Sequence, residues 1–414
     1  MALVEVKLRP TGPWRVGHRA GDRDRVDVIY HSDALYSAMT HAMSSLGWLG
    51  EWLDATARRS EGSLVRCSSL FPFVGRTRLA PPPRSAWPPA HAGKLHVEAA
   101  KLVPLDVIRG ARIDESRWTV DGATGTMTPG GGQPPFEIVL RASAAIDRLT
   151  GVAAPHQTAC LEFATNAGWW GVFEASAEWM PRVKSAFRLL ADSGFGGERS
   201  QGWGRAAAPE FHDASSLFGK DTVEGAWWML SLFSPSANDS IAWERCDYTT
   251  TTRAGWTDST AGIAQKKQVR LIEEGSVIYA EKLVGCAVDV APEGFAHPVY
   301  RAGFALAVAL PAPVVLAPEP EPEPEVVPEP EPVLETVAEF AIEPEFSPEA
   351  ENIMEPESSD DPETDEVQEP LFATHDRLWT DRDATGDTSM PSVVHPDDSP
   401  EVNPGEAQAE EADK

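Results

Sequence analysis

A run of alternating Pro and Glu that follows Leu310, PAPVVLAPEPEPEPEVVPEPEPVLE, limits where this chain of 414 residues can build a core. Such a run favours extended polyproline conformations, repels itself and has too little apolar surface to offset the entropy lost on ordering. We therefore expect residues 311–414 to be a disordered acidic tail and residues 1–310 to hold the folded structure. One apolar patch, Leu371–Asp381, is a candidate docking motif, although ordinary disordered tail is the favoured interpretation.

The charge of the chain divides at the same place. The formal net charge is −29, and residues 311–414 hold 31 acidic but only 3 basic residues. Residues 1–310 hold 33 acidic and 32 basic residues and are therefore close to neutral. Because phosphate contacts depend on Lys and Arg, this balance leaves room for a local basic groove and does not exclude a nucleic-acid ligand.

The cysteines and the hydropathy pattern predict the cellular setting. Cys67, Cys160, Cys246 and Cys286 are scattered, with no C-x-x-C pair of the kind that binds zinc, and suit a reducing compartment. The start, MALVEVKLRP, lacks the apolar segment of a signal peptide, and no stretch approaches the roughly 18 apolar residues that span a bilayer. We expect a cytoplasmic protein with no membrane contact, no bound metal and no small-molecule cofactor.

Two amphipathic helices interrupt a series of strands in the first 210 residues. Apolar residues recur at helical spacing from Asp33 to Leu46, with Ser32 or Asp33 as the N-cap, and from Pro181 to Ser193, with Pro181 in the first turn. The predicted strands are Leu3–Leu8, Phe136–Ala142, Cys160–Phe163, Trp169–Phe173 and a last one that begins near Trp203. This β-α-β…β-α-β order predicts a ferredoxin-like, RRM-related domain.

The next hundred residues show strand patterns and no comparable helix. We predict a second, reduced domain of similar type at residues 211–310, which gives an α+β protein with tandem ferredoxin-like domains at 1–210 and 211–310 and the acidic tail at 311–414. Its predicted strands are Trp227–Phe233, Ile241–Tyr248, Val269–Tyr279 and Phe304–Leu310.

The sharpest local motif is the glycine-rich segment GFGGERSQGWGR at residues 194–205. Its glycines permit positive φ angles and close approach of backbone amides to an anion, its Arg and Ser side chains can bind phosphate, and its Trp offers a face for a base. It follows a helix and precedes a strand, the reverse of a dinucleotide fingerprint, and it lacks an NTPase P-loop pattern. A long helix C-cap is the structural alternative. The candidate RNA contacts are Gly196, Gly197, Arg199, Ser200, Gly202, Trp203, Gly204 and Arg205.

Four stretches together resemble a known family. The glycine-rich segment is similar to the loop of RAMP proteins of CRISPR systems, and three other stretches fit the same family: VIYHSDALYSA (Val28–Ala38), RASAAIDRLTG (Arg141–Gly151) and VRLIEEGSVI (Val269–Ile278). Their order and spacing resemble subunit four of the type III-A Csm effector complex. The resemblance covers most of residues 1–310 and none of the tail.

The resemblance implies a non-catalytic subunit that holds the 5′ handle of the crRNA. It also implies two protein partners, the large polymerase-like signature subunit and a backbone RAMP subunit. Other candidate RNA contacts lie in the charged loop Gly17–Arg25, the four stretches and the basic cluster QKKQVR, which we expect on a strand. They are Arg19, Arg23, Arg25, His31, Ser32, Arg141, Arg148, Lys266 and Arg270.

Two other functions remain open from the sequence. RAMP proteins include metal-independent endoribonucleases that mature CRISPR transcripts, and His31 is the candidate general base for such a reaction. The chain could also be a scaffold that contacts only proteins. We favour RNA holding without catalysis, because no metal triad, nucleophile elbow or zinc motif is present.

Overall fold

A computed structural model describes residues 1–17, 23–88, 99–110, 118–130, 132–218, 225–259 and 262–310. These residues all belong to one unit, Met1–Glu325. Arg19, the acidic segment 311–414 and its patch Leu371–Asp381 lie outside the described residues. The protein is a mixed α+β structure with several antiparallel sheets.

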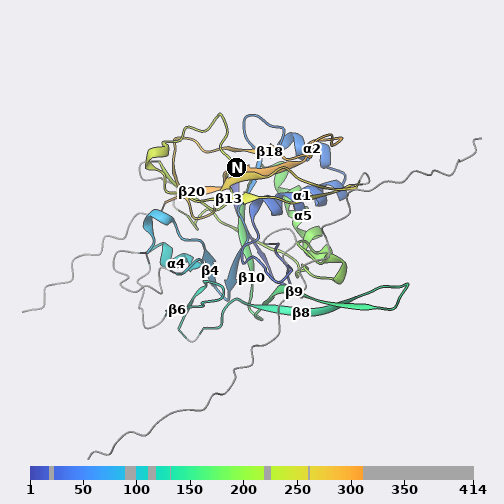
Figure 1. The fold of residues 1–414 in the computed structure, drawn as a ribbon. Coiled ribbons are helices and arrows are strands. Elements are labelled where there is room, and N and C mark those ends of the chain that lie inside the picture. Colours follow the sequence, from blue (N-terminus) through green and yellow to red (C-terminus); the bar gives the residue numbers. More distant parts are fainter. Residues whose placement is uncertain are drawn as a thin grey trace, which may run out of the picture. The chain divides into compact units, whose positions relative to one another are not determined.

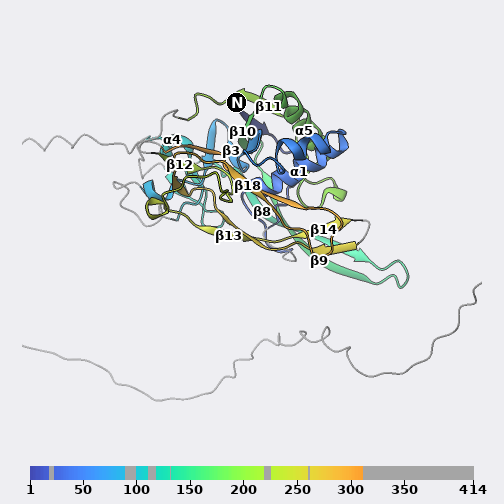
Figure 2. The same cartoon turned by 90° about the horizontal axis from the view of Figure 1, so that it is seen from above.

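A seven-stranded sheet forms the centre of the N-terminal part (Figures 1 and 2). Its order is β11-β1-β10-β3-β4-β5, β2 also pairs with β10, and all neighbouring strands are antiparallel. The strands are β1 (Ala2–Leu8), β2 (Val65–Cys67), β3 (Phe71–Val74), β4 (Thr77–Ala80), β5 (Val103–Pro104), β10 (Ala167–Ala175) and β11 (Glu210–Asp213).

Two long helices, α1 (Ser32–Ser45) and α5 (Trp179–Ser193), lie side by side against this sheet (Figure 2). Both match the predicted helices, and their apolar residues at three- and four-residue spacing are buried in one core with β1 and β10. The predicted N-cap of α1 was wrong: His31 occupies that position, while Ser32 and Asp33 lie inside the helix with their side chains buried in other contacts. The short helices are α2 (Leu49–Ala55) and α4 (Leu105–Ile108).

Strand β10 is buried on both faces. Trp169 and Phe173 point to the helix side and pack in the core of α1 and α5, whereas Trp170 and Val172 pack on the opposite side with Trp228. Trp228 lies on β12, the central strand of a three-stranded sheet of order β17-β12-β20. The strands of this sheet are β12 (Ala226–Met229), β17 (Val277–Tyr279) and β20 (Ala307–Ala309). Burial on both faces explains why the sequence of β10, AGWWGVFEA, is apolar at consecutive positions.

Two-stranded pairs make up the rest of the C-terminal part, and residues 225–259 and 262–310 contain no α-helix, as predicted. The predicted strand Ile241–Tyr248 was wrong, because a 3₁₀ turn at Trp243–Arg245 (η3) interrupts it. The predicted strand Val269–Tyr279 is divided by a turn in which Gly275 has a φ of +86°. The pairs are β13 (Thr250–Arg253) with β16 (Val269–Ile272), β14 (Trp256–Ser259) with β15 (Gly262–Gln265), and β18 (Gly285–Asp289) with β19 (Tyr300–Phe304).

A long hairpin, β8 (Phe136–Ile146) with β9 (Ala153–Phe163), extends away from the other described elements in Figure 1. Both strands were predicted, although each is longer than the apolar pattern indicated. The segment Asp147–Gly151 is the hairpin turn, in which Asp147 accepts hydrogen bonds from the Leu149 amide (2.9 Å) and the Thr150 hydroxyl (2.6 Å). The remaining elements are β6 (Trp118–Val120), β7 (Met127–Pro129) and the 3₁₀ turns η1 (Arg84–Ala86) and η2 (Arg199–Gln201).

Candidate nucleic-acid interface

The glycine-rich loop is fixed to the body of the protein by an aromatic anchor. Phe195 packs edge-on against Trp14, with ring centroids 4.7 Å apart, and against Tyr30, at 5.0 Å. Gly194 ends α5 with a φ of +81° and a ψ of 148°, which differs from the left-handed helical conformation of a usual glycine C-cap. Gly196 has a φ of +98°, and a Cβ there would lie 2.7 Å from the Arg15 carbonyl oxygen. The loop therefore holds a defined conformation beside Arg15.

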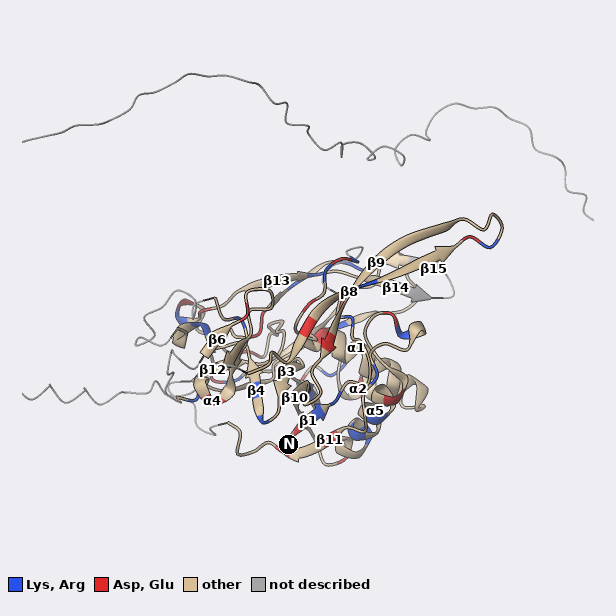
Figure 3. Cartoon of the chain, turned by 90° about the horizontal axis from the view of Figure 1, so that it is seen from below, with Lys and Arg blue, Asp and Glu red and all other residues tan. Residues whose placement is uncertain are grey.

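A groove with a volume of about 430 Å³ lies against this loop. One wall comes from the N-terminal part, including α1 and the loop residues Gly196, Gly197 and Arg199, and the other from the C-terminal part between Arg253 and Arg301. In Figure 3, basic segments in blue lie on the chain around α1, β14 and β15. Five cationic side chains line the groove, against a single carboxylate, that of Asp33. The cations are Arg15, Arg199, Arg253, Lys266 and Arg301.

The groove carboxylate is itself buried and paired. The Asp33 side chain has 0% exposure; the Arg253 guanidinium donates to both its oxygens at 3.0 and 3.1 Å, and Arg301 donates to Oδ2. Burial opposes ionisation of Asp33, but the two guanidinium groups prevail and lower its pKa to about 2. The carboxylate therefore stays ionised and neutralises one of the five cations.

The remaining cations repel one another. Burial, together with the nearby Arg301, lowers the pKa of Lys266 below the usual value of a lysine. Burial and the positive charges of Arg199 and Lys266 likewise lower the pKa of His41, which is therefore neutral at neutral pH. An anionic ligand relieves such repulsion, so the electrostatics of the groove favour a polyanion.

Two aromatic side chains complete the groove. Trp256 is 54% exposed and lines it together with Tyr300. An exposed ring beside a row of cations is the combination that single-stranded nucleic acids bind, with bases stacked on the ring and phosphates on the cations.

A second hollow, about 810 Å³ in volume, shares Arg253 with the groove. Its wall includes three carboxylates, Asp27, Glu273 and Glu274, beside Arg84, Lys101 and Arg253. This mixed charge is much less favourable to phosphate than the groove, which has one neutralised carboxylate. The groove is therefore the better nucleic-acid site.

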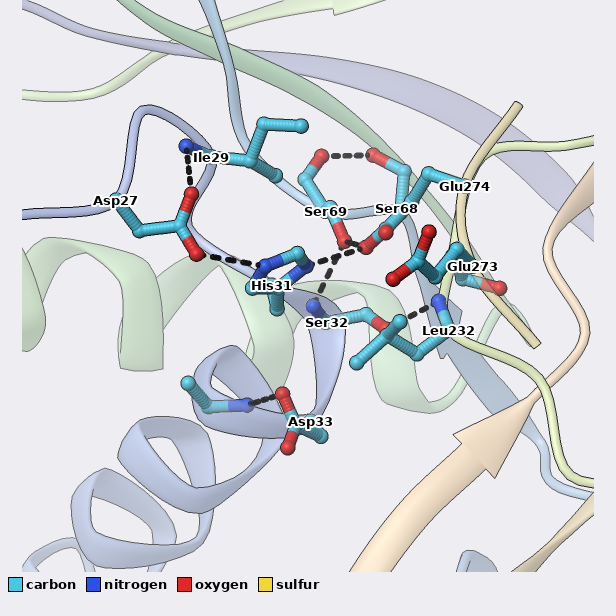
Figure 4. A network of polar contacts seen from close by, with 12 residues as sticks. Asp27, Ile29, His31, Ser32, Asp33, Ser68, Ser69, Leu232, Glu273 and Glu274 are labelled. Atoms are coloured by element: carbon cyan, nitrogen blue, oxygen red, sulfur yellow. Dashed lines mark hydrogen bonds and ion pairs between the residues drawn. The ribbon is translucent and has the colours of Figure 1, made fainter. Parts of the chain in front are cut away.

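His31 belongs to a partly buried ionic network (Figure 4), in which the side chains of His31, Asp27 and Glu274 are 13%, 19% and 2% exposed. Its Nε2 lies 3.0 Å from Asp27 Oδ2 and its Nδ1 lies 2.9 Å from Glu274 Oε1, and Glu274 also accepts from the Ser69 hydroxyl. Burial alone would lower the pKa of His31, but Glu274 and Asp27 together raise it to about 10. At neutral pH the ring is an imidazolium that donates through both nitrogens and has no lone pair for a general base.

Ser32 is also occupied in the interior. Its amide donates to the Ser69 hydroxyl at 2.8 Å, and its own hydroxyl accepts from the Leu232 amide at 2.9 Å (Figure 4). His31 and Ser32, both expected to contact RNA, join residues 27–33 to the C-terminal part. Neither lines the groove, and His31 lines the second hollow instead.

The other predicted residues fall into three groups. Gly196, Gly197, Arg199 and Lys266 line the groove, although Lys266 follows β15 in an irregular segment rather than lying on the expected strand. Ser200 and Arg205 are exposed and Gly202 is half-buried elsewhere in the loop, while Arg23, Arg25, Arg141, Arg148 and Arg270 are exposed on other elements.

Trp203 and Gly204 are buried, and neither lines the groove. Trp203 is 7% exposed, and the Arg141 guanidinium lies 6.0 Å from its ring centroid, so the ring has little free face for a base. A Cβ on Gly204 would lie 2.1 Å from the Phe195 carbonyl oxygen, so this glycine permits the two ends of the loop to meet.

Sequence reasoning missed four groove residues, Arg15, Arg253, Trp256 and Arg301. They come from three distant segments, and none stands in a glycine-rich or basic motif. The described part of the chain holds no group of three or more His, Cys, Asp or Glu that could bind a metal ion, and its four cysteines are free thiols. Among the described elements, no helix has the length and apolar character needed to cross a membrane.

Comparisons with known proteins bear on both parts of the chain. Residues 223–310 match the family model of the CRISPR Csm4 C-terminal domain. No curated protein gives a significant match. A chain in the crystal structure of a Csm3–Csm4 subcomplex of the type III-A CRISPR-Cas interference complex is similar over 74% of this chain and 98% of that chain, with 14% identity and a TM-score of 0.50. A chain of a Csm1–Csm4 cassette in complex with pppApA is similar over 75% and 98%, with 18% identity and a TM-score of 0.46.

Residues 223–310 match the CRISPR Csm4 C-terminal domain, and the fold of the chain is similar to that of a subunit in the Csm3–Csm4 subcomplex. The family resemblance drawn from short stretches of sequence is confirmed for this C-terminal part, since VRLIEEGSVI lies within the matched residues. The other three stretches lie outside them.

Proposed function

We propose that this chain is a non-catalytic crRNA-binding subunit of a type III CRISPR (Csm) interference complex and that it holds the 5′ handle of the crRNA in the groove. The observation that carries the proposal is the groove beside the glycine-rich loop, where five cations surround one neutralised carboxylate and an exposed Trp256. Membership of residues 223–310 in the Csm4 C-terminal domain family supports the same function.

The proposal includes a ferredoxin-like fold for residues 1–210. The order β11-β1-β10-β2, with α1 between β1 and β2 and α5 between β10 and β11, is the arrangement expected for a β-α-β-β-α-β domain. Residues 211–310 would form a reduced domain of related type.

Each part of the groove has a role in this proposal. Arg15, Arg199 and Lys266 bind phosphates of the handle, and Trp256 stacks on a splayed base, as in other proteins that recognise single-stranded RNA. The exposed Ser200 and Arg205 extend the phosphate contacts along the loop.

The subunit would dock two protein partners, the large polymerase-like signature subunit and a backbone RAMP subunit. Support for the backbone partner comes from the fold, which is similar to that of a chain in a Csm3–Csm4 subcomplex. The large subunit is implied by the sequence resemblance alone.

The structure does not favour the alternative of a metal-independent endoribonuclease. RNA cleavage of that type needs a general base with a free lone pair near a 2′-hydroxyl. His31, the candidate base, is half-buried between Asp27 and Glu274, and as an imidazolium it donates through both ring nitrogens.

A first experiment isolates the tagged, full-length protein from its native or reconstituted operon and sequences the RNA that comes with it. Short RNAs that share one 5′ handle, together with a large signature subunit and other RAMP chains, are the expected result. Recovery of partner proteins without RNA would refute RNA holding and favour a scaffold.

A second experiment measures binding of the recovered RNA over a range of salt concentrations. Arg199→Ala should weaken binding and reduce the slope of log K against log salt by about 0.7, the value for one lost phosphate contact on a single strand. Arg76→Ala is the matched control, because Arg76 is an exposed arginine in the turn between β3 and β4 that does not line the groove. Equal effects of the two substitutions would refute the assignment of the groove.

A further inference from the structure

Two arginines of the C-terminal part share one carboxylate of the N-terminal part at the wall of the groove. Arg253 ends β13 and binds Asp33 with Nε at 3.0 Å and a terminal nitrogen at 3.1 Å, and Arg301 of β19 binds the same carboxylate. The side chains are 14% and 11% exposed, and that of Asp33 is 0% exposed. The three groups form a fixed cluster, which we call the Asp33 clamp.

The Asp33 clamp has more donors than internal acceptors. A guanidinium carries five N–H donors. Arg301 uses one terminal nitrogen for Asp33 and the other for the Ala254 carbonyl (2.9 Å), while its buried Nε has no acceptor among the described residues. That nitrogen is itself enclosed, so a ligand would meet the terminal nitrogens instead, each of which carries a second N–H. Because both arginines line the groove, a ligand in the groove can accept from these remaining donors.

The charge of the Asp33 clamp indicates which ligand fits. Two guanidinium groups and one carboxylate leave a net charge of +1, which matches the single negative charge of a phosphodiester. Guanidinium groups also bind phosphate oxygens with a geometry that a lysine cannot reproduce. If the Asp33 clamp served only to join the two parts of the chain, one arginine would suffice to pair with Asp33. The cluster would also have no need to lie on the wall of the groove.

We infer that the Asp33 clamp is a binding site for one internal phosphodiester of the RNA, with Arg253 and Arg301 as the contacting groups and Asp33 as the positioning residue. This inference rests on the proposed function, since the RNA is the one held in the groove. The Asp33 clamp would fix the position of the RNA along the groove. Its three groups are held by three separate elements, so only the phosphate that reaches them can bind.

The test replaces one phosphate at a time. The recovered RNA is resynthesised with a neutral methylphosphonate at each position in turn, and its affinity for the full-length protein is measured by fluorescence anisotropy. In the wild type, one position should lose affinity on the order of tenfold, as expected for a charge-assisted hydrogen bond. In Arg301→Lys, which keeps the charge but removes the fork, the loss at that position should shrink to less than about threefold.

Arg66→Lys is the matched control. Arg66 is also paired with a carboxylate, that of Glu174 at 3.1 Å, and its buried Nε also lacks an acceptor in the described part of the chain, yet it does not line the groove. This substitution should leave the methylphosphonate profile unchanged. Asp33→Asn should flatten the profile by releasing the two arginines, and a sharp profile in that variant would refute the positioning role.

The outcomes separate the inference from the function it rests on. If the RNA binds but Arg301→Lys leaves the loss at every position unchanged, the Asp33 clamp is only a salt bridge and RNA holding stands. If the wild type binds no RNA, the proposed function fails as well. Thermal denaturation of each variant shows whether a change in binding reflects unfolding.

Discussion

The imidazolium of His31 should make the stability of this protein fall with pH in a range where few other groups titrate. His31 lies between Asp27 and Glu274, and its pKa is raised from 6.5 to about 10 in the folded protein. In the unfolded chain the ring loses its proton near pH 6.5, whereas the folded protein keeps it. The stabilisation is therefore complete below about pH 6.5 and is lost as the pH rises towards 10.

The size of the effect follows from the two pKa values. While the folded state holds one more proton than the unfolded state, the free energy of unfolding falls by up to about 1.4 kcal/mol per pH unit. Between pH 6.5 and 8.5 the imidazolium should lose about 2 kcal/mol of its contribution, allowing for partial protonation of the unfolded chain at the start of this range.

The assay is urea unfolding followed by tryptophan fluorescence at several pH values. The comparison protein combines His31→Gln with Asp27→Asn, which removes the imidazolium without leaving two carboxylates face to face. The difference in free energy of unfolding between wild type and double variant should shrink by about 2 kcal/mol from pH 6.5 to 8.5. His41→Gln serves as the control, because the pKa of His41 is lowered in the fold and its contribution changes mainly below this range.

Parallel pH profiles for the wild type and the double variant would refute this reasoning. Such a result would mean that His31 is neutral in the folded protein. The argument against a His31 general base would then lose its main support as well, because one ring nitrogen would carry a lone pair.

Two further predictions concern the glycine-rich loop. Phe195→Ala should lower the free energy of unfolding by about 3–5 kcal/mol, since a buried ring packed against two other rings is lost; a loss below about 1 kcal/mol in urea unfolding would contradict the anchor role. Gly196→Ala should weaken RNA binding and destabilise the fold more than Gly202→Ala, because both have positive φ but only the first places a Cβ 2.7 Å from the Arg15 carbonyl. Equal losses in unfolding and anisotropy measurements would show that the backbone angle alone matters.

Periodicity was sufficient to predict the elements that carry the core. The helices α1 and α5 and the strands β1 and β10 were found where their apolar patterns were expected to place them, and β8 and β9 were found but extend beyond theirs. Short strands such as β2, β3 and β4 were missed because three or four residues do not show a period. The strand expected from Trp203 was wrong, since the turn continues and the chain reaches the sheet only at β11.

The candidate site was predicted only where it is local in sequence. The glycine-rich loop supplies Arg199 to the groove, but Arg253 and Arg301 are 48 residues apart and meet only because the end of β13 and the start of β19 both reach Asp33 of α1. Tertiary contacts of this kind leave no spacing that a sequence pattern could show.

The stretches that carried the family resemblance have mostly internal contacts. Glu274 of VRLIEEGSVI binds His31, and Asp147 of RASAAIDRLTG closes a hairpin turn. Asp33 of VIYHSDALYSA is buried against two arginines. The residues of these stretches therefore mostly hold the fold together, whereas several of the residues that face the groove lie between the stretches.

The burial of β10 on both faces couples the two cores of the described fold. Its helix-facing side packs in the core that contains α1, α5 and the β19 residues Ala302 and Phe304, and its other side packs in the core that contains β12 and β20. The wall of the groove at Tyr300 and Arg301 continues directly from the first of these cores. A substitution on the helix-facing side of β10 would therefore reach the groove through β19, although no residue of β10 lines the groove.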